Sequence, residues 1–211
     1  MNTERFRKFV TSAEELTALI GVPSELVIKK QLAEVDAHMR TFIEESPFLL
    51  LGTVGKGGHC DVSPRGDAPG IAKVLDSKTL LIPERRGNRR ADSLRNILET
   101  GQVGILFMIP GMGETLRVNG KACLIRDEEI LASFTVNGKE PVVVIAVEVE
   151  ECFLQCAKAL LRSKLWDKPV EPHHSSLPCF AEILVDQTKI EGQSVESLNR
   201  LIEDSYVNNL Y

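Results

Sequence analysis

The spacing of apolar residues divides the chain into a helical start, a strand-rich middle and a polar end. Near the N-terminus, Ser12 stands three residues before Glu15 and just ahead of an apolar stretch, which is the spacing of a helix-capping box. Gly21 is suited to end that helix, and Pro23 is suited to open the next one. Residues 1–45 are therefore predicted to be helical.

A second amphipathic helix is predicted ahead of Pro47, which stops it. Its apolar residues recur at intervals of three and four, so they fall on one face of a helix. These residues are Leu32, Val35, Met39, Phe42 and Ile43.

The middle of the chain changes to the short apolar runs and partial alternation of β-strands. Residues 48–54 form an apolar run bounded by Pro47 and by a glycine-rich turn, which indicates a buried strand followed by a hairpin. Turns and short helices separate the strands without a regular βαβ alternation, so an antiparallel barrel or sandwich is favoured over a doubly wound sheet. The predicted strands are 48–54, 60–63, 79–82, 103–109, 114–126 and 142–150, and the predicted helices among them are 91–99 and 156–166.

The predicted fold class is mainly β with flanking helices (α+β), built as one domain with two extensions. A length of 211 residues is within the range of a single domain, and no internal repeat divides the chain. We expect an N-terminal helical extension over 1–45, a β core over 46–167 and a C-terminal extension over 168–211 that packs on the core. The C-terminal extension is more polar, contains three prolines and is predicted to hold one helix near 195–202.

Composition excludes several classes of protein. With 43% apolar residues, the chain can bury a sizeable core without disulfides. Its formal net charge of −5 argues against broad nucleic-acid binding through bulk charge. No apolar run reaches the ~18 residues of a membrane-spanning helix, and the N-terminus lacks the apolar stretch of a secretory signal. The five cysteines, an odd number, indicate reduced thiols, and we expect a cytoplasmic protein.

The most unusual local feature is a cluster of five arginines in an otherwise acidic chain. The cluster comprises Arg85, Arg86, Arg89, Arg90 and Arg95, and it lies between a predicted strand and a predicted helix. A helix N-terminus offers unpaired N–H groups, and guanidinium groups offer paired donors that match a phosphate. The cluster is therefore a candidate site for a phosphorylated ligand. The alternative is a solvated basic loop, or one that pairs with Asp and Glu elsewhere in the chain.

A second candidate is the segment 61–67 (DVSPRGD), where a predicted strand ends. Pro64 and Gly66 shape a turn that presents Arg65. The alternative is an ordinary surface turn with an Arg–Asp pair that contributes little free energy.

A third candidate is the helix that carries Lys158, Arg162 and Trp166. Steps of four place these residues on one helix face, where two cations and an indole could meet a flat, anionic ligand. The alternative is a pair of long cationic side chains lying beside a half-buried tryptophan.

Several common motifs are absent from the sequence. It contains no G-x-x-x-x-G-K-[ST] loop, no G-x-G-x-x-G after a strand, no H-E-x-x-H and no G-x-S-x-G. The neighbours His59 and Cys60, and the pair His173 and His174, lack further ligands at metal spacing, so no metal site is predicted.

Several linked motifs occur in an order that identifies a family. They are 46–48 (SPF), 61–67 (DVSPRGD), 81–83 (LIP), 87–90 (GNRR), 92–94 (DSL), 109–111 (IPG), 114–122 (ETLRVNGKA), 156–160 (CAKAL) and 165–166 (LW). In this order the chain resembles the pyridoxamine 5′-phosphate oxidase-like flavoproteins, in particular an uncharacterised FMN-binding branch of them. The resemblance spans almost the whole chain, and the linked motifs are far more specific together than singly.

The resemblance implies a split β-barrel and a homodimer with FMN at the subunit interface. Arg65 matches an arginine that contacts the flavin phosphate in the family. The backbone of Val62, Ser63 and Pro64 matches the stretch that lies along the isoalloxazine ring.

Further cofactor contacts follow from the same resemblance. Asn88, Arg89 and Arg90 match the polar and basic triplet that cradles the phosphate at the start of a helix. Thr115 falls where the pyridoxamine phosphate oxidases carry a flavin-contacting glutamine, and Arg117 is the next outward position, able to reach the same ligand. The resemblance also implies that the second subunit contributes to the cofactor site. Its contribution is expected to come from Lys158, Arg162 and Trp166, the third candidate above.

The activity implied is that of an FMN-dependent oxidoreductase with a small-molecule substrate, in which FMN carries the redox chemistry and the protein binds and orients it. The segment that holds the substrate phosphate in the oxidases has no clear equivalent in residues 172–211, so the substrate stays open. One alternative is a flavin store or sensor without turnover. Another is a split-barrel protein for heme or a deazaflavin, and heme would need an axial ligand such as His59 or Cys60. No nucleic-acid or membrane partner is expected.

Overall fold

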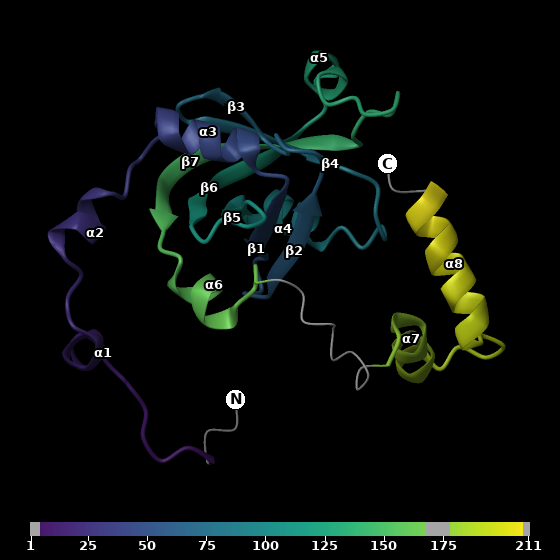
Figure 1. The fold of residues 1–211 in the computed structure, drawn as a ribbon, viewed down its shortest axis with the longest axis horizontal. Coiled ribbons are helices and arrows are strands. Elements are labelled where there is room, and N and C mark those ends of the chain that lie inside the picture. Colours follow the sequence, from purple (N-terminus) through teal and green to yellow (C-terminus); the bar gives the residue numbers. More distant parts are fainter. Residues whose placement is uncertain (1–4, 168–177, 209–211) are drawn as a thin grey trace.

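The computed structural model describes residues 5–167 and 178–208, and it contains one curled, seven-stranded antiparallel sheet with helices around it (Figure 1). The strands are β1 (Phe48–Val54), β2 (Cys60–Gly66), β3 (Lys73–Asp76), β4 (Thr79–Glu84), β5 (Gln102–Met108), β6 (Thr115–Ile125) and β7 (Val143–Gln155). Their order in the sheet is β2-β1-β5-β6-β7-β4-β3. The predicted α+β class is therefore confirmed.

The predicted strands correspond to all of these except β3. β3 carries one buried side chain, Val74, among four residues. A segment this short and this exposed produces neither an apolar run nor a clear alternation, so the sequence pattern does not reveal it.

The barrel interior is filled by residues that alternate along the strands. Leu49 of β1 pairs with Phe107 of β5, which pairs with Leu116 of β6, and all three side chains are fully buried. Burying an apolar side chain of this size stabilises the fold by ~1.5–3 kcal/mol. Rows of this kind across the central strands make up the core.

A glycine stands at the bulge between the two longest strands, β6 and β7. The pairing of β6 with β7 shifts register between Asn119 and Gly120. A Cβ atom on Gly120 would overlap the carbonyl oxygen of Glu148, so only glycine permits this approach. Such a bulge increases strand twist and lets two long strands bend around a core.

The amphipathic helix predicted before Pro47 is shorter than its apolar pattern. α3 (Ala37–Glu45) begins after Asp36, whose side chain accepts a first-turn N–H at 2.8 Å. Leu32 instead forms an isolated bridge with Cys152 of β7, and Val35 is buried ahead of the helix. The prediction of one helix through Leu32 is wrong because extended backbone also places these side chains on the core.

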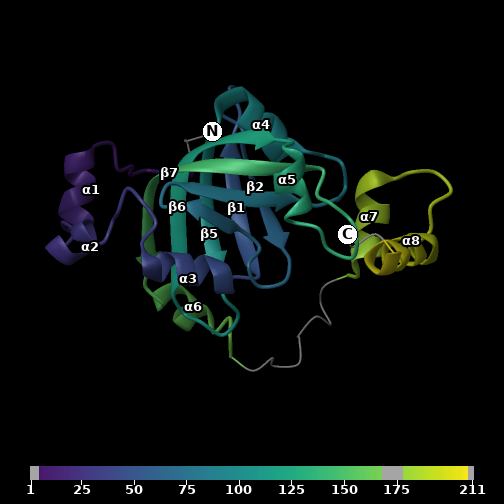
Figure 2. The same ribbon diagram turned by 90° about the horizontal axis from the view of Figure 1, so that it is seen from above.

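Two short helices lie on one flank of the barrel, α1 (Ala13–Ile20) and α2 (Glu25–Lys29) (Figures 1 and 2). The predicted cap of α1 is confirmed, because the Ser12 hydroxyl accepts the Glu15 N–H at 3.1 Å. Gly21 ends the helix with a φ of 81°. Neither helix buries any of its residues.

Three helices connect or extend the strands. α4 (Asp92–Thr100) follows β4 and packs on β1, α5 (Glu128–Ala132) joins β6 to β7, and α6 (Lys158–Ser163) follows β7. The helix predicted after the arginine cluster is thus confirmed. The helix predicted over 156–166 is shorter, because Lys164 adopts left-handed backbone with a φ of 54°.

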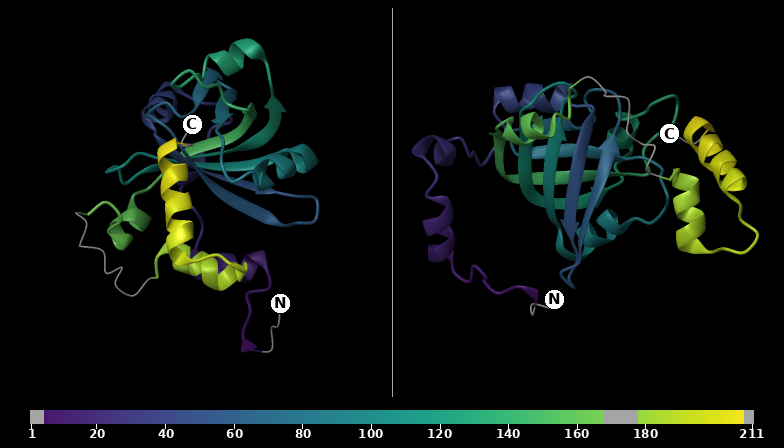
Figure 3. Two further views of the ribbon diagram at one scale, coloured as in Figure 1. Left: turned by 90° about the vertical axis from the view of Figure 1, so that its right-hand side faces the viewer. Right: turned by 60° about the horizontal axis from the view of Figure 1, so that its bottom comes forward.

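The last two helices lie on the flank opposite α1 and α2 (Figures 2 and 3). α7 (Phe180–Thr188) and α8 (Val195–Asn208) pack against each other, with Ala181 and Leu198 buried. α8 confirms the helix predicted in the C-terminal extension and continues beyond it. Among residues 5–167 and 178–208, none of the helices has the length and apolar character that a membrane-spanning helix requires.

Candidate functional site

An open groove of about 1290 Å³ lies between β2 and the segment that follows β4. It brings together residues 63–67 and 83–94, which contain two of the candidate motifs. Val142 and Ser205 also line it, the latter from α8. The predicted site residues in its lining are Ser63, Pro64, Arg65, Asn88, Arg89 and Arg90.

β2 is an edge strand, and its alternation sends neighbouring candidates to opposite faces. Ser63 and Arg65 pair with fully buried residues of β1, so both side chains share the interior face of the sheet. Val62 and Pro64 point to the outer face, where Val62 is 67% exposed. Because β1 is the sole neighbour of β2 in the described sheet, a ligand can reach both faces around one strand edge.

Arg65 forms an ion pair with Glu84 inside the groove, with Nη2 at 3.1 Å from Oε2. Nε of Arg65 and Oε2 of Glu84 are buried and have no hydrogen-bond partner among the described residues. Burial raises the pKa of Glu84, and the Arg65 guanidinium opposes that rise. Since buried donors are normally satisfied, Nε of Arg65 is a donor open to a polar ligand.

Glu84 is not among the sequence candidates. The signal that could have identified it is an acidic residue that closes an apolar strand directly before an arginine run.

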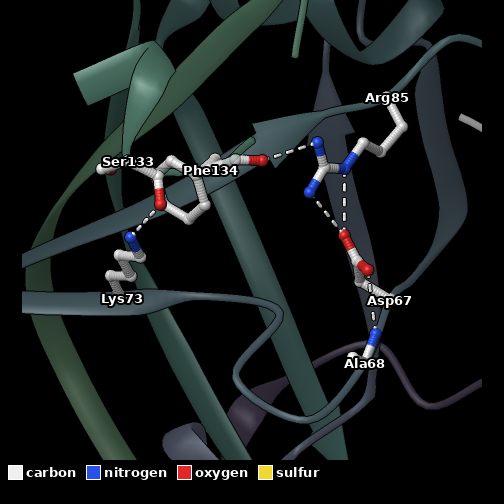
Figure 4. Close-up of polar contacts among 6 residues, drawn as sticks. All are labelled: Asp67, Ala68, Lys73, Arg85, Ser133 and Phe134. Carbon is white, nitrogen blue, oxygen red and sulfur yellow. Dashed lines mark hydrogen bonds and ion pairs between the residues drawn. The ribbon is translucent and has the colours of Figure 1, made fainter. Parts of the chain in front are cut away.

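Arg85, the first arginine of the cluster, is bound within the fold (Figure 4). Its Nε and Nη2 donate to Oδ2 of Asp67 at 2.9 and 2.8 Å, and its Nη1 donates to the carbonyl oxygen of Phe134 at 2.9 Å. Lys73 donates to the carbonyl oxygen of Ser133 beside it and lies over the Phe134 ring, 4.4 Å from its centre. Arg85 therefore ties the end of β2 to the segment after α5, and the alternative of pairing with an acid is confirmed for this residue.

The other arginines of the cluster lie on the surface. Arg90 pairs with Asp92, and both side chains are partly or largely exposed. Arg86, Arg89 and Arg95 form no ion pair or side-chain hydrogen bond with any residue in the described part of the chain. Arg86 and Arg89 line the groove, whereas Arg95 does not.

The loop reaches α4 through strained backbone. Arg89 and Ala91 have φ values of 62° and 57°, a region that is unfavourable for residues with a Cβ atom. The Asn88 side chain accepts the Arg90 N–H at 3.0 Å and holds the turn. Ala91 occupies the cap position of α4 and supplies no side-chain cap. The N-terminal N–H groups and the positive end of the helix dipole thus remain available to an anion.

A buried hydroxyl fixes α4 to β2. Ser93 is 3% exposed, donates to Oδ2 of Asp61 and lies 2.9 Å from the Ser63 hydroxyl. Because Ser93 uses its hydroxyl hydrogen on Asp61, the Ser63 hydroxyl donates to Ser93. Ser93 is absent from the sequence candidates; its place four residues before buried Ile97 is the signal that could have found it.

The outer face of the sheet carries a second set of candidates. One row of directly opposed residues crosses five strands on this face: Pro64, Leu50, Leu106, Arg117 and Phe153. Arg117 donates to Glu151 at 3.1 Å, and its guanidinium lies 5.0 Å from the centre of the Phe153 ring. Arg117 is therefore separated from Arg65 by the thickness of the sheet.

Two glycines leave the neighbouring part of this face without side chains. In the next row, Gly52 of β1 lies opposite Gly104 of β5, and a Cβ atom on Gly52 would come within 3.3 Å of the Gly104 carbonyl oxygen. Thr115 is 8% exposed and bonds to the Gln155 side chain at 3.3 Å. Neither Thr115 nor Arg117 lines the groove.

The three candidates of the C-terminal half lie outside the groove as well. Lys158 and Arg162 are exposed on α6, and Nε1 of Trp166 donates to the carbonyl oxygen of Met112 at 2.7 Å. The prediction that they share one helix face is wrong, because α6 ends at Ser163 and Trp166 lies beyond it. One chain alone does not bring these residues to the arginine loop.

Potential metal ligands do not gather in the described residues, where no group of three or more His, Cys, Asp or Glu side chains could hold an ion. His59 and Cys60 lie at the hairpin that opens β2, outside the residues that line the groove. The pair His173 and His174 lies outside the described residues.

Comparisons with known proteins identify the family. A family profile described as pyridoxamine 5′-phosphate oxidase matches residues 35–156. No curated protein matches the chain. Among solved structures, HupZ of Group A Streptococcus is 19% identical over 58% of this chain and 94% of its own, with a TM-score of 0.49. An FMN-binding protein of Syntrophomonas wolfei is 12% identical over 55% and 82%, with a TM-score of 0.42.

General stress protein 26 of Bacillus anthracis is similar to the same degree, with 16% identity over 54% of this chain and 88% of its own and a TM-score of 0.43. Such distant likenesses carry no information about function. The profile match, by contrast, covers more than half of the chain and contains every strand of the sheet. The chain therefore belongs to the pyridoxamine 5′-phosphate oxidase family.

Proposed function

We propose that the chain binds FMN in the groove between β2 and the arginine loop, and that it acts as a cytoplasmic, homodimeric oxidoreductase on a small organic molecule. The observation that carries the proposal is the buried, unsatisfied Nε of Arg65, which lines the same groove as the unpaired Arg86 and Arg89. A ligand with a phosphate group would satisfy these donors.

The residues of the groove fit the phosphate end of FMN. Arg65, Arg86 and Arg89 supply guanidinium donors, and the uncapped start of α4 supplies backbone N–H groups. Arg89 and Ala91 adopt left-handed backbone at the entrance to α4, a conformation that also occurs in the nests that bind anions. The strain at these residues is compensated when a ligand holds the loop.

The ring of FMN fits the outer side of the same edge. Val62 and Pro64 form an exposed apolar surface on the outer face of β2. The unpaired edge of β2 offers backbone N–H and C=O groups to the polar side of the isoalloxazine ring. The opposed glycines on β1 and β5 leave two positions of this face without side chains, which gives a planar ring room to approach.

A second copy would supply what one chain lacks. Lys158, Arg162 and Trp166 remain exposed and distant from the groove of their own chain. A partner seated on the outer face of the sheet would cover Val62 and bring its own copies of these residues toward the ring. The homodimer with FMN at the interface is thus the arrangement that uses all the candidates.

FMN supplies the redox chemistry when bound, and the protein binds and orients it. Arg117 lies on the outer face with its charge partly balanced by Glu151, and Lys158 would come from the partner. A cation near the ring favours negative charge on the reduced flavin. Neither residue needs to act as a general base.

The first test is the visible absorption spectrum of the purified protein, taken before and after FMN is added and the sample is desalted. Retained flavin bands support the proposal, and a protein that stays colourless after incubation with FMN contradicts it. Consumption of a reductant by the flavin-loaded protein would separate an oxidoreductase from a flavin store or sensor.

A pair of arginine variants tests the position of the phosphate. Arg89→Ala should weaken FMN binding by ~1.5–3 kcal/mol through loss of a charge-assisted contact, and should leave riboflavin binding unchanged. Arg95→Ala is the matched control, because Arg95 belongs to the same cluster without lining the groove. Equal losses in the two variants would contradict a phosphate held by Arg89.

A further inference from the structure

The groove also holds a buried acid that opposes the ligand proposed for it. Glu84 ends β4, its side chain is 18% exposed, and its Oε2 lies 3.1 Å from Nη2 of Arg65. A carboxylate in a phosphate groove repels the phosphate and lowers its affinity. Replacement by a neutral residue would remove that repulsion, so the presence of Glu84 calls for a physical explanation.

The charged surroundings of Glu84 leave Arg65 as its ion-pair partner. On the adjacent strand β7, the residue opposite Glu84 is the uncharged Val143. Arg85 is bound to Asp67, and Arg65 is the cation that acts on the Glu84 carboxylate. The charged residues that line the groove and the adjoining cavity around Glu84 are Asp61, Arg65, Asp67, Arg85, Arg86, Arg89, Arg90, Asp92, Lys139 and Glu140.

The contact between Arg65 and Glu84 is an ion pair without good hydrogen-bond geometry. Nε of Arg65 and Oε2 of Glu84 both stay unsatisfied by described residues, although the atoms are buried. A buried pair with such geometry recovers little of the free energy that desolvation costs. The incomplete recovery accounts for the raised pKa of Glu84, where burial outweighs the nearby guanidinium. Phosphate oxygens would offer Arg65 better-aligned acceptors.

We propose that Glu84 is a positioning residue that holds the Arg65 side chain in the groove of the unliganded protein. When a phosphorylated ligand binds, its phosphate takes the place of Glu84 at the Arg65 guanidinium, and Glu84 takes up a proton from solvent. The inference rests on the proposed function. The phosphate binds the Arg65 guanidinium, the ion pair breaks, and the carboxylate left beside a dianion becomes a neutral carboxylic acid. No electron moves. Binding of FMN is therefore coupled to proton uptake, and binding of riboflavin is not.

Isothermal titration calorimetry in two buffers of different ionisation enthalpy measures the protons taken up on binding. For the native protein, FMN should draw in a fraction of one proton near neutral pH, and riboflavin none. Glu84→Gln should remove this uptake and bind FMN about tenfold more tightly, the factor that corresponds to one pKa unit of like-charge repulsion. Titration of the FMN phosphate itself is common to both proteins, so the difference between them belongs to Glu84.

Glu140→Gln is the matched control. Glu140 is an exposed carboxylate that lines a neighbouring cavity of about 230 Å³ with Arg85 and Arg86, and it forms no hydrogen bond or ion pair with Arg65. This variant should keep the proton uptake of the native protein. Loss of uptake in Glu140→Gln to the same extent as in Glu84→Gln would show a general charge effect and overturn the inference.

The outcomes separate the two proposals. Equal proton uptake in the native protein and Glu84→Gln, with FMN still bound more tightly than riboflavin, overturns the inference and leaves the proposed function standing. Failure of both flavins to bind overturns both.

If Glu84→Gln does not fold, the pH dependence of flavin binding to the native protein tests the inference. Above about pH 7 a phosphate monoester is mostly dianionic, so its own titration no longer changes the affinity. The ratio of FMN to riboflavin affinity should then fall as the pH rises, and a constant ratio overturns the inference.

Discussion

At the scale of single residues, the arginine cluster divides into residues that hold the fold and residues that are available to a ligand. Arg85 and Arg86 are adjacent in sequence, yet the Arg85 side chain is 16% exposed and bound to Asp67, whereas Arg86 is exposed and unpaired among the described residues. The partners of Arg85, Asp67 and the Phe134 carbonyl, come from segments distant in sequence, so the residues around the arginines do not predict which arginine is bound.

Substitution of Arg85 is predicted to lower stability, whereas substitution of Arg86 is predicted to weaken ligand binding. Arg85→Ala should lower the free energy of unfolding by about 2–3 kcal/mol, because it removes a buried ion pair and a hydrogen bond to the Phe134 carbonyl. Arg86→Ala should change stability by less than ~0.5 kcal/mol and weaken FMN binding instead. Urea denaturation and flavin titration of the two variants measure both effects. Equal stabilities would show that the Arg85 contacts do not support the fold.

Two cysteines are predicted to differ in reactivity. Burial raises the pKa of the Cys152 thiol to about 11, whereas a hydrogen bond from the Lys158 backbone N–H lowers the pKa of the exposed Cys156 thiol. Since the thiolate is the reactive form, iodoacetamide at pH 8 should alkylate Cys156 at least ~100-fold faster than Cys152. Peptide mapping by mass spectrometry gives the two rates. In urea the rates should converge, and similar rates in the folded protein would contradict the buried placement of Cys152.

At the scale of elements, the strands follow from apolar runs, while several helix ends depend on single residues. β1 and β5 stand close to where their runs of apolar residues predict them, because each contributes alternate side chains to one core. α3 and α6 are shorter than their patterns, since the Asp36 cap sets one start and left-handed Lys164 sets one end. Periodicity predicts which side chains are buried better than it predicts where a helix begins.

Substitution of the glycine at the bulge between β6 and β7 is predicted to cost much more stability than substitution of a glycine in the arginine loop. Gly120→Ala should lower the free energy of unfolding by at least ~3 kcal/mol, because the new Cβ atom would overlap the backbone of Glu148. Gly87→Ala should be nearly neutral for stability, since nothing lies within 4 Å of its added Cβ atom. Thermal unfolding of the two variants is the measurement. A stable Gly120→Ala protein would mean that β6 and β7 can separate without losing the barrel.

At the scale of the whole molecule, the N-terminal helices α1 and α2 flank the barrel without contributing to its core. α1 and α2 bury none of their residues, and Leu19, Ile20 and Leu26 are between 67% and 76% exposed. The connection to the barrel begins at Lys30, whose Nζ donates to the Leu154 carbonyl oxygen at 2.7 Å. The barrel of one chain is therefore complete without the segment that precedes Lys30.

Removal of residues 1–29 is predicted to leave the barrel intact. The melting temperature should change by less than ~3 °C, because every described residue of this segment, 5–29, is exposed. Differential scanning calorimetry measures the shift, and size-exclusion chromatography with light scattering measures the mass. A large fall in melting temperature, or a loss of mass by half, would show that the exposed apolar residues pack on a second copy.

The β-rich class, the positions of most strands and the two motifs that line the groove can be predicted from the amino-acid sequence, because short-range periodicity and residue type carry that information. The resemblance already implied that Arg65 and the arginine loop meet at one phosphate, and the groove contains both. The tertiary structure was needed to show that Glu84 pairs with Arg65 in this groove and that Thr115 and Arg117 lie on the other face of the sheet. The physical reason is that a strand fixes only the alternation of its own side chains. Which residues meet across a barrel depends on how the sheet closes, and that is set by register shifts and bulges between strands distant in sequence.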